Sequence, residues 1–342
     1  MNRLLISAAV VFATMTPIVA QTQDDAGCRA AIRFHEDRNG SALLVLRDGQ
    51  VACEAYARGA NAETGIELWS GTKSFSGMLA AAAVQDGLLT LDEPIAKTIV
   101  EWIDDRRSSA TIRQLLSLTS GIQTRIAVAP SYADSVWLPF ASNPGTRFQY
   151  GASPYQLFGE VMTRKLAATS QPPDIFTYLK RRILDPIGLT PTRWRRTTTG
   201  DLLLPQGAAM SARDWAKFGE LVRLGGVNNG RALVDPMAFR EQFVGTTANP
   251  GYGLTWWLPA PERDRDIVSE TVDIGRRGGV PKDLVTAAGA GDQRLYVVPS
   301  LGLTIVRQAA FTPQIDAPLR QRGGAGPPWS DAAFFGTLLG SR

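Results

Sequence analysis

The segment WSGTKSF (residues 69–75) opens an apolar helical pattern that continues to Gln85. The pattern predicts a helix from about Gly71 to Gln85, and a helix with so little polar surface is expected in the protein interior. Ser70 and Lys73 stand three residues apart, so their hydroxyl and amine lie on one helical face and can touch. The amide groups at a helix start are unpaired and point toward an approaching oxyanion. The segment therefore favours a serine that acts as a nucleophile within an oxyanion hole.

The same four residues allow a structural interpretation. Ser-x-x-Lys alone is a weak motif, because a chain of 342 residues contains such a pair by chance. In the alternative interpretation, Ser70 caps the helix and Lys73 is a solvated residue of its first turn. The rest of the sequence has to decide between the two.

The composition excludes several classes of protein. A disordered or collagen-like chain is excluded, because 44% of the residues are hydrophobic and the net charge is only +4. The single histidine, His35, and the two cysteines, Cys28 and Cys53, are too few for a zinc, iron–sulfur or copper site. A Ser-His-Asp triad would have to use His35 itself. We expect no metal and no organic cofactor, and a hydrolase would need another base.

The basic residues do not indicate a nucleic-acid partner. They are 30 Arg and 6 Lys, scattered and interleaved with acids. Short clusters at 180–182 and 193–196 are typical of solvated helix faces or loop charges. Dinucleotide binding is not indicated either, since Gly289-Ala290-Gly291 is followed by Arg294 where a third glycine belongs.

The N-terminus predicts export. Arg3 gives a positive start, residues 4–15 are almost entirely apolar or small, and Val19-Ala20-Gln21 offers a cleavage site. We expect a signal peptide over residues 1–20, cut near Ala20, and a periplasmic or secreted mature protein. The alternative is an uncleaved membrane anchor. No later segment has the length of a transmembrane helix, so no stable membrane span is expected after cleavage.

The expected export also bears on the state of the two cysteines. An exported chain meets oxidising conditions, which makes a Cys28–Cys53 disulfide plausible, tying an N-terminal helix to a strand. Two buried free thiols are the competing interpretation.

Periodicity divides the chain into a sheet part and a helical part. Strand patterns at 41–47 and 51–57 flank Asp48-Gly49, a strong hairpin signal, and strand patterns return late in the chain. This arrangement indicates one sheet built from both chain ends, with a helical insertion between them. We expect a sheet-containing α/β domain at 21–97 and 249–342 and a mostly helical domain at 98–248. The late strands are expected at 253–258, 294–298 and 303–306, and the helices at 112–116, 155–165, 175–183, 211–224 and 332–339.

Five ordered blocks carry a resemblance to a known family. They are 69–75, Leu91-Asp92-Glu93-Pro94, 115–121 (LLSLTSG), 144–150 (PGTRFQY) and 207–214 (GAAMSARD). With these blocks the chain resembles the serine β-lactamase and penicillin-binding superfamily. The resemblance is to the branch of class C β-lactamases, D-alanyl-D-alanine carboxypeptidases, related esterases and 6-aminohexanoate-oligomer hydrolases. It runs from about Ser41 to Gln308, and it implies an antiparallel sheet flanked by helices, a helical second domain and an active site between them.

The resemblance also implies site residues. Ser70 matches the nucleophile, Lys73 its lysine partner, and Tyr150 the tyrosine of the Tyr-x-Asn motif, whose third position here is Ala152. The third motif, Lys-Thr-Gly or His-x-Gly on a strand, falls at Ala287-Ala288-Gly289, where the glycine is kept and the cation is not. Its surroundings give the candidate oxyanion and substrate-binding residues Ala287, Gly289, Ala290 and Gly291.

These matches predict an exported serine hydrolase that forms a Ser70 acyl-enzyme. Either Lys73 or Tyr150 can serve as the base. Because the cation and the amide side chain are missing, we expect small-molecule esters or uncharged amides as substrates. A cation from Arg276, Arg277 or Lys282 would instead favour a peptide-like substrate, and so a D-Ala-D-Ala carboxypeptidase or a β-lactamase. The alternative of another class is a non-catalytic cell-wall-binding or receptor paralogue. The oligomeric state is not predicted.

Overall fold

The computed structural model describes residues 26–126, 128–170, 172–259, 272–274, 279–312 and 327–340. The predicted signal peptide, with its cleavage site near Ala20, lies outside these residues, as do Arg276 and Arg277. Within them, no helix is both long and apolar enough to cross a membrane.

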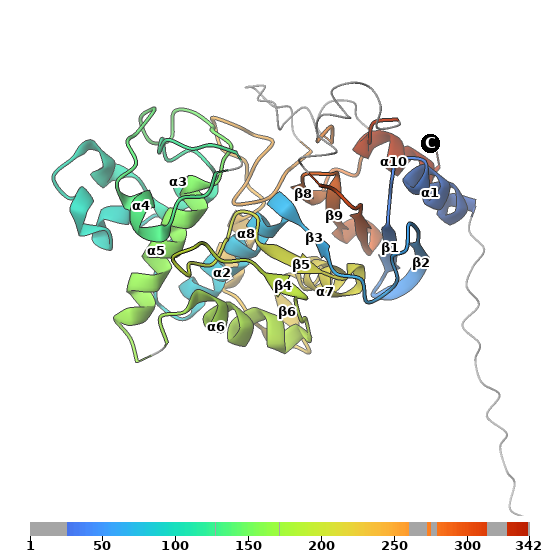
Figure 1. Cartoon of the computed structure of the whole chain (residues 1–342), viewed down its shortest axis with the longest axis horizontal. Coiled ribbons are helices and arrows are strands. Elements are labelled where there is room, and N and C mark those ends of the chain that lie inside the picture. Colours follow the sequence, from blue (N-terminus) through green and yellow to red (C-terminus); the bar gives the residue numbers. More distant parts are fainter. Residues whose placement is uncertain are drawn as a thin grey trace, which may run out of the picture.

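Five antiparallel strands form the central sheet, in the order β2-β1-β10-β9-β8. The outer pair closes through Asp48 and Gly49, both with positive φ (49° and 77°), as the predicted hairpin requires. Ala42 then pairs with Gln308, so the two ends of the chain meet in neighbouring strands. The expected sheet built from both chain ends is confirmed (Figure 1). The strands are β1 (Ala42–Arg47), β2 (Gln50–Tyr56), β8 (Val285–Gly289), β9 (Gln293–Val298) and β10 (Leu303–Gln308).

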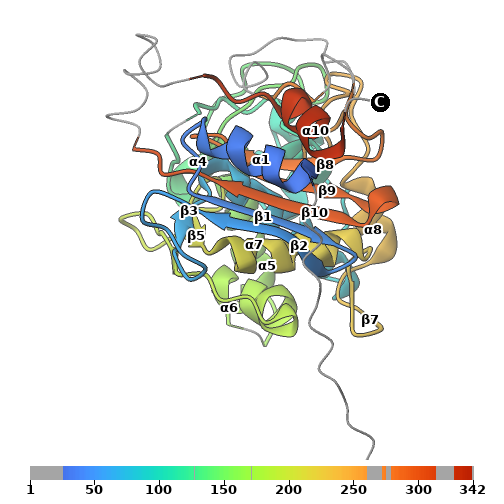
Figure 2. The same ribbon diagram turned by 90° about the vertical axis from the view of Figure 1, so that its right-hand side faces the viewer.

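Helices cover both faces of this sheet. In Figure 2, α1 (Ala26–Glu36) and α10 (Asp331–Leu339) lie on one face and α7 (Ala212–Arg223) on the other. Gly219 lets α7 approach closely, because a Cβ at that position would lie 2.5 Å from Thr304 Cγ2. The helix α10 is anchored by a buried ion pair in which Arg294 Nε lies 2.8 Å from the Asp331 carboxylate.

The middle of the chain is mostly helical and lies beside the sheet (Figure 1). The division into domains at 97/98 and 248/249 stays a prediction. The helices are α2 (Ser74–Gln85), α3 (Ile112–Leu116), α4 (Tyr132–Val136), α5 (Ser153–Ala167), α6 (Ile175–Leu179) with a π-helical continuation (Lys180–Leu184), and α8 (Pro236–Glu241). Short strands are β3 (Ile66–Glu67), β4 (Arg193–Trp194), β5 (Ala208–Met210), β6 (Val227–Asn228) and β7 (Arg231–Ala232).

The prediction of a strand over 253–258 is wrong. The segment is a buried turn, in which Thr255 has a positive φ of 79° and Gly253 N donates to Trp256 O over 2.9 Å. Only Trp257 pairs with the sheet, through two hydrogen bonds to Thr286. Residues 253–258 are all buried, and a short apolar run in a buried turn cannot be distinguished from a buried strand by its sequence pattern alone.

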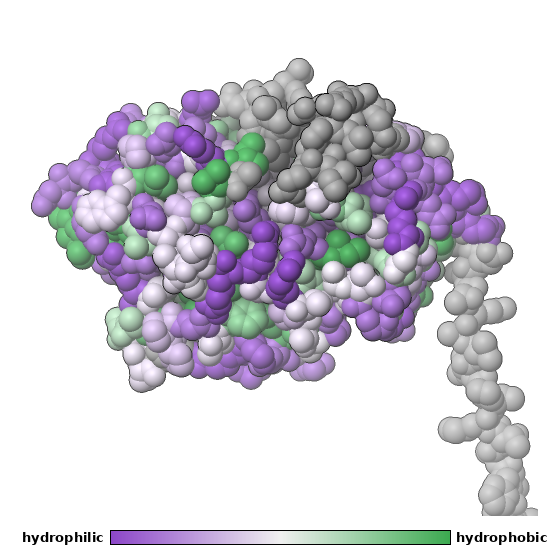
Figure 3. Space-filling view, viewed as in Figure 1, coloured by the Kyte–Doolittle hydropathy of each residue, from purple (hydrophilic) through white to green (hydrophobic). Residues whose placement is uncertain are grey.

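The surface is mixed in character. On the face shown in Figure 3, hydrophobic residues form small separate patches among hydrophilic ones. Larger apolar side chains such as Trp137 and Val128 are exposed, which is usual for a folded chain.

Candidate active site

The nucleophile candidate lies in a 3₁₀ turn, η1 (Trp69–Lys73), that leads into the buried helix α2. The expected helix therefore begins as a tighter turn, in which side chains three residues apart eclipse one another. This stacking brings Lys73 Nζ to 2.9 Å from Ser70 Oγ. Gly71 is required by close packing, because a Cβ there would lie 2.8 Å from the Trp215 ring.

Lys73 is a buried amine, and no carboxylate in the described residues forms an ion pair with it. Its exposure is 1%, and its Nζ also donates to Pro205 O over 3.0 Å. The rings of Tyr150 and Tyr155 lie beside it, with centroids 4.8 and 5.5 Å from Nζ. Burial lowers the pKa of Lys73 to about 7, so a neutral amine is available near neutral pH. The alternative that Lys73 is a solvated first-turn residue is wrong.

Tyr150 belongs to the same cluster of side chains. Its ring is buried and stacks on Trp257, with centroids 5.6 Å apart. The preceding segment is fixed by Gln149 N, which donates to Leu118 O over 2.9 Å. The structure thus brings Ser70, Lys73 and the Tyr150 ring together from one 3₁₀ turn and one loop.

Ala152 occupies a fully buried position two residues after Tyr150. Its backbone N donates to Arg125 O over 3.0 Å, which fixes the loop. The methyl side chain can neither donate nor accept a hydrogen bond, so this position offers a substrate no amide group.

The end of β8 lies directly against η1. A Cβ on Gly289 would lie 1.9 Å from Leu68 O and 3.0 Å from Gly71 N, so only glycine fits there. Ala287, two residues earlier, faces the same side and is 1% exposed. Beyond the strand, Ala290 is exposed and Gly291 turns the chain with a φ of 75°. Of the third-motif candidates, Gly289 lies against the turn that carries Ser70.

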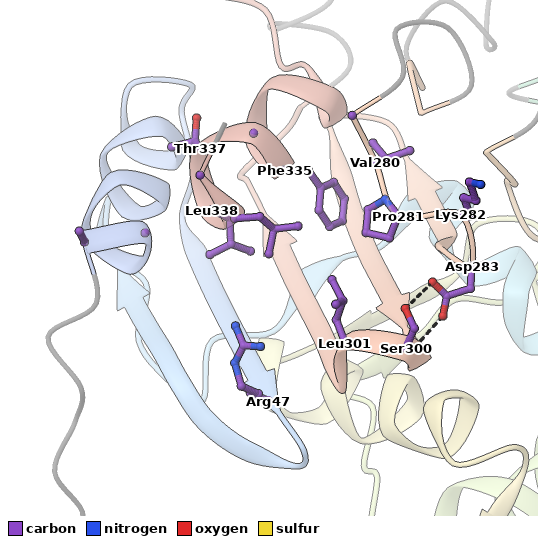
Figure 4. Close-up of a pocket in the computed structure, with 16 residues that line it drawn as sticks. Arg47, Val280, Pro281, Lys282, Asp283, Ser300, Leu301, Phe335, Thr337 and Leu338 are labelled. Carbon is purple, nitrogen blue, oxygen red and sulfur yellow. Dashed lines mark hydrogen bonds between the residues drawn. The ribbon is translucent and has the colours of Figure 1, made fainter. Parts of the chain in front are cut away.

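Lys282 does not supply the missing cation. It precedes the opposite end of β8, whereas the end at Gly289 contacts η1. Lys282 instead borders a groove of about 1360 Å³ between α10 and the segment 279–283. Figure 4 shows this groove, with Phe335, Leu338 and Pro281 along it and Asp283 hydrogen-bonded to Ser300. Neither Ser70 nor Tyr150 lines this groove.

His35 and the cysteines lie away from this cluster. His35 packs against Gly40 in a buried site, where a Cβ on Gly40 would lie 2.1 Å from the ring. Burial and the charge of Arg307 lower the pKa of His35 to about 3. Cys28 and Cys53 are joined as a disulfide between α1 and β2, with Cα atoms 5.8 Å apart. In the described residues, no cluster of three or more His, Cys, Asp or Glu side chains could hold a metal ion.

Sequence reasoning missed two neighbours of the nucleophile. The first is the carbonyl of Pro205, a backbone group without any signal in the sequence. The second is Arg195, whose guanidinium carbon lies 5.2 Å from the centroid of the Trp69 ring. Arg195 keeps 32% of its side chain exposed, as expected for the charges at 193–196, and Arg193 is 60% exposed; nothing in the sequence indicated that Arg195 also packs on Trp69.

The fold and this serine–lysine pair define a class of proteins, the hydrolases of the β-lactamase fold, and comparison with known families agrees. The β-lactamase family model matches residues 19–315, and this chain belongs to that family.

Three solved structures illustrate the likeness in fold. A D-alanine carboxypeptidase AmpC from Burkholderia cenocepacia is 17% identical, with 93% of this chain and 98% of that chain covered and a TM-score of 0.64. A putative 6-aminohexanoate-dimer hydrolase from Bacillus anthracis is also 17% identical, with 85% and 79% covered and a TM-score of 0.64. EstCE1, a hydrolase with promiscuous acyltransferase activity, is 14% identical, with 92% and 99% covered and a TM-score of 0.65.

A curated relative matches only in part. Protein flp of Staphylococcus aureus (strain NCTC 8325 / PS 47) is 24% identical over an alignment of 180 residues, and 46% of this chain is covered. The match spans about a third (35%) of that relative's length.

Proposed function

We propose that the chain is an exported serine hydrolase that transfers acyl groups through a Ser70 acyl-enzyme. The observation that carries this proposal is the distance of 2.9 Å between Ser70 Oγ and the buried amine of Lys73. An amine with a pKa of about 7 is half neutral at that pH and can accept the serine proton. The non-catalytic alternative gives no reason to bury a lysine whose hydrogen-bond partners in the described residues, Ser70 Oγ and Pro205 O, are both uncharged, which is a costly arrangement.

The proposed reaction has two halves. In the first, Ser70 Oγ attacks the carbonyl carbon while the serine proton passes to Lys73 or Tyr150. The bond between the carbonyl carbon and the leaving group then breaks, and the base passes the proton to the leaving group. In the second, water attacks the acyl carbon and loses a proton to the same base, the bond between the acyl carbon and Ser70 Oγ breaks, and the base returns the proton to Oγ as the carboxylic acid leaves. Backbone N–H groups near Ser70 and at the end of β8 are the proposed donors to the oxyanion.

We propose esters and uncharged amides as the substrates. Ala287 and Ala152 provide neither a cation nor an amide group where a substrate carboxylate or amide side chain would bind. Losing one charged hydrogen bond costs roughly 1.5–3 kcal/mol, which is about ten- to a hundredfold in kcat/KM. A neutral ester loses nothing at these positions.

The test is the intact mass of the protein after treatment with a fluorophosphonate. Wild type should gain one adduct and Ser70→Ala none, with equal melting temperatures for the two proteins. Equal labelling of both would reject Ser70 as the nucleophile, and an unlabelled wild type would favour the binding paralogue. Export is tested separately, by N-terminal sequencing of the mature protein, which should begin after Ala20.

A further inference from the structure

Arg195 is bound at three points to the turn formed by residues 203–207. Its backbone N donates to Gly207 O over 2.9 Å, and its own carbonyl accepts from Leu203 N over 3.0 Å. Its side chain reaches further along the turn, where Nη2 donates to Gln206 O over 2.8 Å. The turn is also closed by Gly207 N, which donates to Leu203 O over 2.9 Å, and the Arg195 side chain adds the bond to the carbonyl of Gln206, next to Pro205.

The same turn carries the carbonyl that holds the catalytic lysine candidate. Pro205, next to Gln206, accepts from Lys73 Nζ over 3.0 Å. Within the part of the chain that the structure describes, this bond and the 2.9 Å contact with Ser70 Oγ are the two hydrogen bonds of the amine, and together they fix its direction. A displaced Pro205 carbonyl would leave the amine free to rotate away from the serine.

On its other side, Arg195 contacts the turn that carries Ser70. The guanidinium lies over Trp69, the residue before Ser70, with 5.2 Å between its central carbon and the ring centroid. Trp69 has a positive φ of 49°, a costly conformation for a bulky residue that persists only where the surroundings hold it. Glu67 completes the contact, with its carboxylate 3.5 Å from Arg195 Nε.

We propose that Arg195 is a positioning residue, which clamps the turn 203–207 against η1 so that the Pro205 carbonyl holds the Lys73 amine at Ser70 Oγ. The inference rests on the proposed function, because it assigns Arg195 a part in the same acyl transfer. Arginine suits this role, since its planar fork can bond the turn and stack on an aromatic ring at once.

The groups around Lys73 determine how the pH profile would change if Arg195 no longer held the turn 203–207. The titratable groups that face the amine are Tyr150 from the loop and Tyr155 from α5, and Tyr155 is itself hydrogen-bonded to Tyr252 over 2.8 Å. No charged partner in the described residues competes with burial for control of its protonation. A loosened turn would admit water, and the midpoint of the pH profile would rise.

The test compares Arg195→Gln with Arg195→Lys and with Arg193→Gln as the matched control. Arg193 also binds Glu67 but is exposed and contacts neither Trp69 nor the turn 203–207. The readouts are the fluorophosphonate labelling rate, kcat and KM for p-nitrophenyl acetate, the pH profile of kcat/KM, and the melting temperature.

We expect Arg195→Gln to lower the labelling rate and kcat by roughly ten- to a hundredfold, with KM within threefold and a pH midpoint raised above that of wild type. Arg195→Lys should recover part of the loss, and Arg193→Gln should match wild type. A purely structural role would lower the melting temperature without moving the pH midpoint of the folded protein, and that result would overturn the inference.

Two further outcomes separate this inference from the proposed function. A labelled wild type with an equally labelled, unshifted Arg195→Gln would overturn the inference alone, while an unlabelled wild type would overturn both. If Arg195→Gln does not fold, the kinetics of Arg195→Lys test the inference alone. A slower labelling rate than wild type in Arg195→Lys would support the positioning role of Arg195, and wild-type kinetics would contradict it.

Discussion

Gly289→Ala tests whether the contact between β8 and η1 sets the geometry of the nucleophile. The added Cβ would lie 1.9 Å from Leu68 O, whereas real Cβ contacts essentially never fall below 3.0 Å, so the two backbones must separate by about 1.1 Å. Gly289 does not have a positive φ, and the substitution therefore acts through this contact rather than through backbone strain. A misplacement of about 1 Å costs on the order of a hundredfold in rate, or about 2.7 kcal/mol in transition-state stabilisation.

The assay is the rate of fluorophosphonate labelling, measured together with thermal unfolding. Gly336→Ala is the matched control, since its Cβ would meet nothing within 4 Å and alanine is favoured over glycine in a helix such as α10. We expect a roughly hundredfold slower reaction for Gly289→Ala and wild-type labelling for the control. Wild-type labelling by a folded Gly289→Ala protein would refute the reasoning that the strand end and the turn are rigidly packed.

The acylation rate should rise with pH through about 7, where Lys73 loses its proton. Lys73→Arg should abolish this rise together with most of the activity. A wild-type acylation rate that does not change with pH would exclude the lysine as the base. Protein from an oxidising compartment should show no thiol that titrates with Ellman-type reagent after denaturation, and two thiols would contradict the Cys28–Cys53 bond. Short-chain p-nitrophenyl esters should have a higher kcat/KM than a chromogenic cephalosporin, and Ala287→Lys should narrow the difference; efficient cephalosporin hydrolysis by wild type would favour a β-lactamase. The pKa of His35 is lower in the folded protein (about 3) than in the unfolded chain (6.5), so its contribution to stability is present above pH 6.5 and is lost as the pH falls toward 3. The melting temperature of wild type should therefore decrease between pH 7 and 5, and that of His35→Leu should decrease less. The activity of His35→Leu should stay within a fewfold of wild type. An equal decrease in the melting temperatures of the two proteins would contradict burial of a neutral imidazole.

Sequence patterns predicted those features of the fold that depend on residues close together in the chain. Asp48-Gly49 identifies the hairpin because few other residue pairs accept two positive φ angles in succession. The Ser70–Lys73 contact follows from a spacing of three residues, which both α-helical and 3₁₀ geometry satisfy. Such features need no knowledge of the distant chain.

Features that depend on distant partners could not be predicted in this way. The turn at Thr255 is fixed by its backbone N, which donates to Leu116 O over 3.1 Å, a residue far away in the sequence. Arg195 belongs to a cluster of charges that gives no sign of which member packs on Trp69. Residue types specify side-chain chemistry, whereas the Pro205 carbonyl is identical in kind to every other backbone carbonyl.

The pairing of Ala42 with Gln308 has a consequence for how the chain reaches its folded state. The strand β1 has no inner neighbour until the chain reaches Leu303, the partner of Arg47, more than 250 residues later. Contacts of such long sequence separation form slowly, and an unpaired strand edge invites association with other chains. A growing or truncated polypeptide that ends before Leu303 should therefore remain incompletely assembled and depend on chaperones, even though its α2 segment and its β1–β2 hairpin are complete.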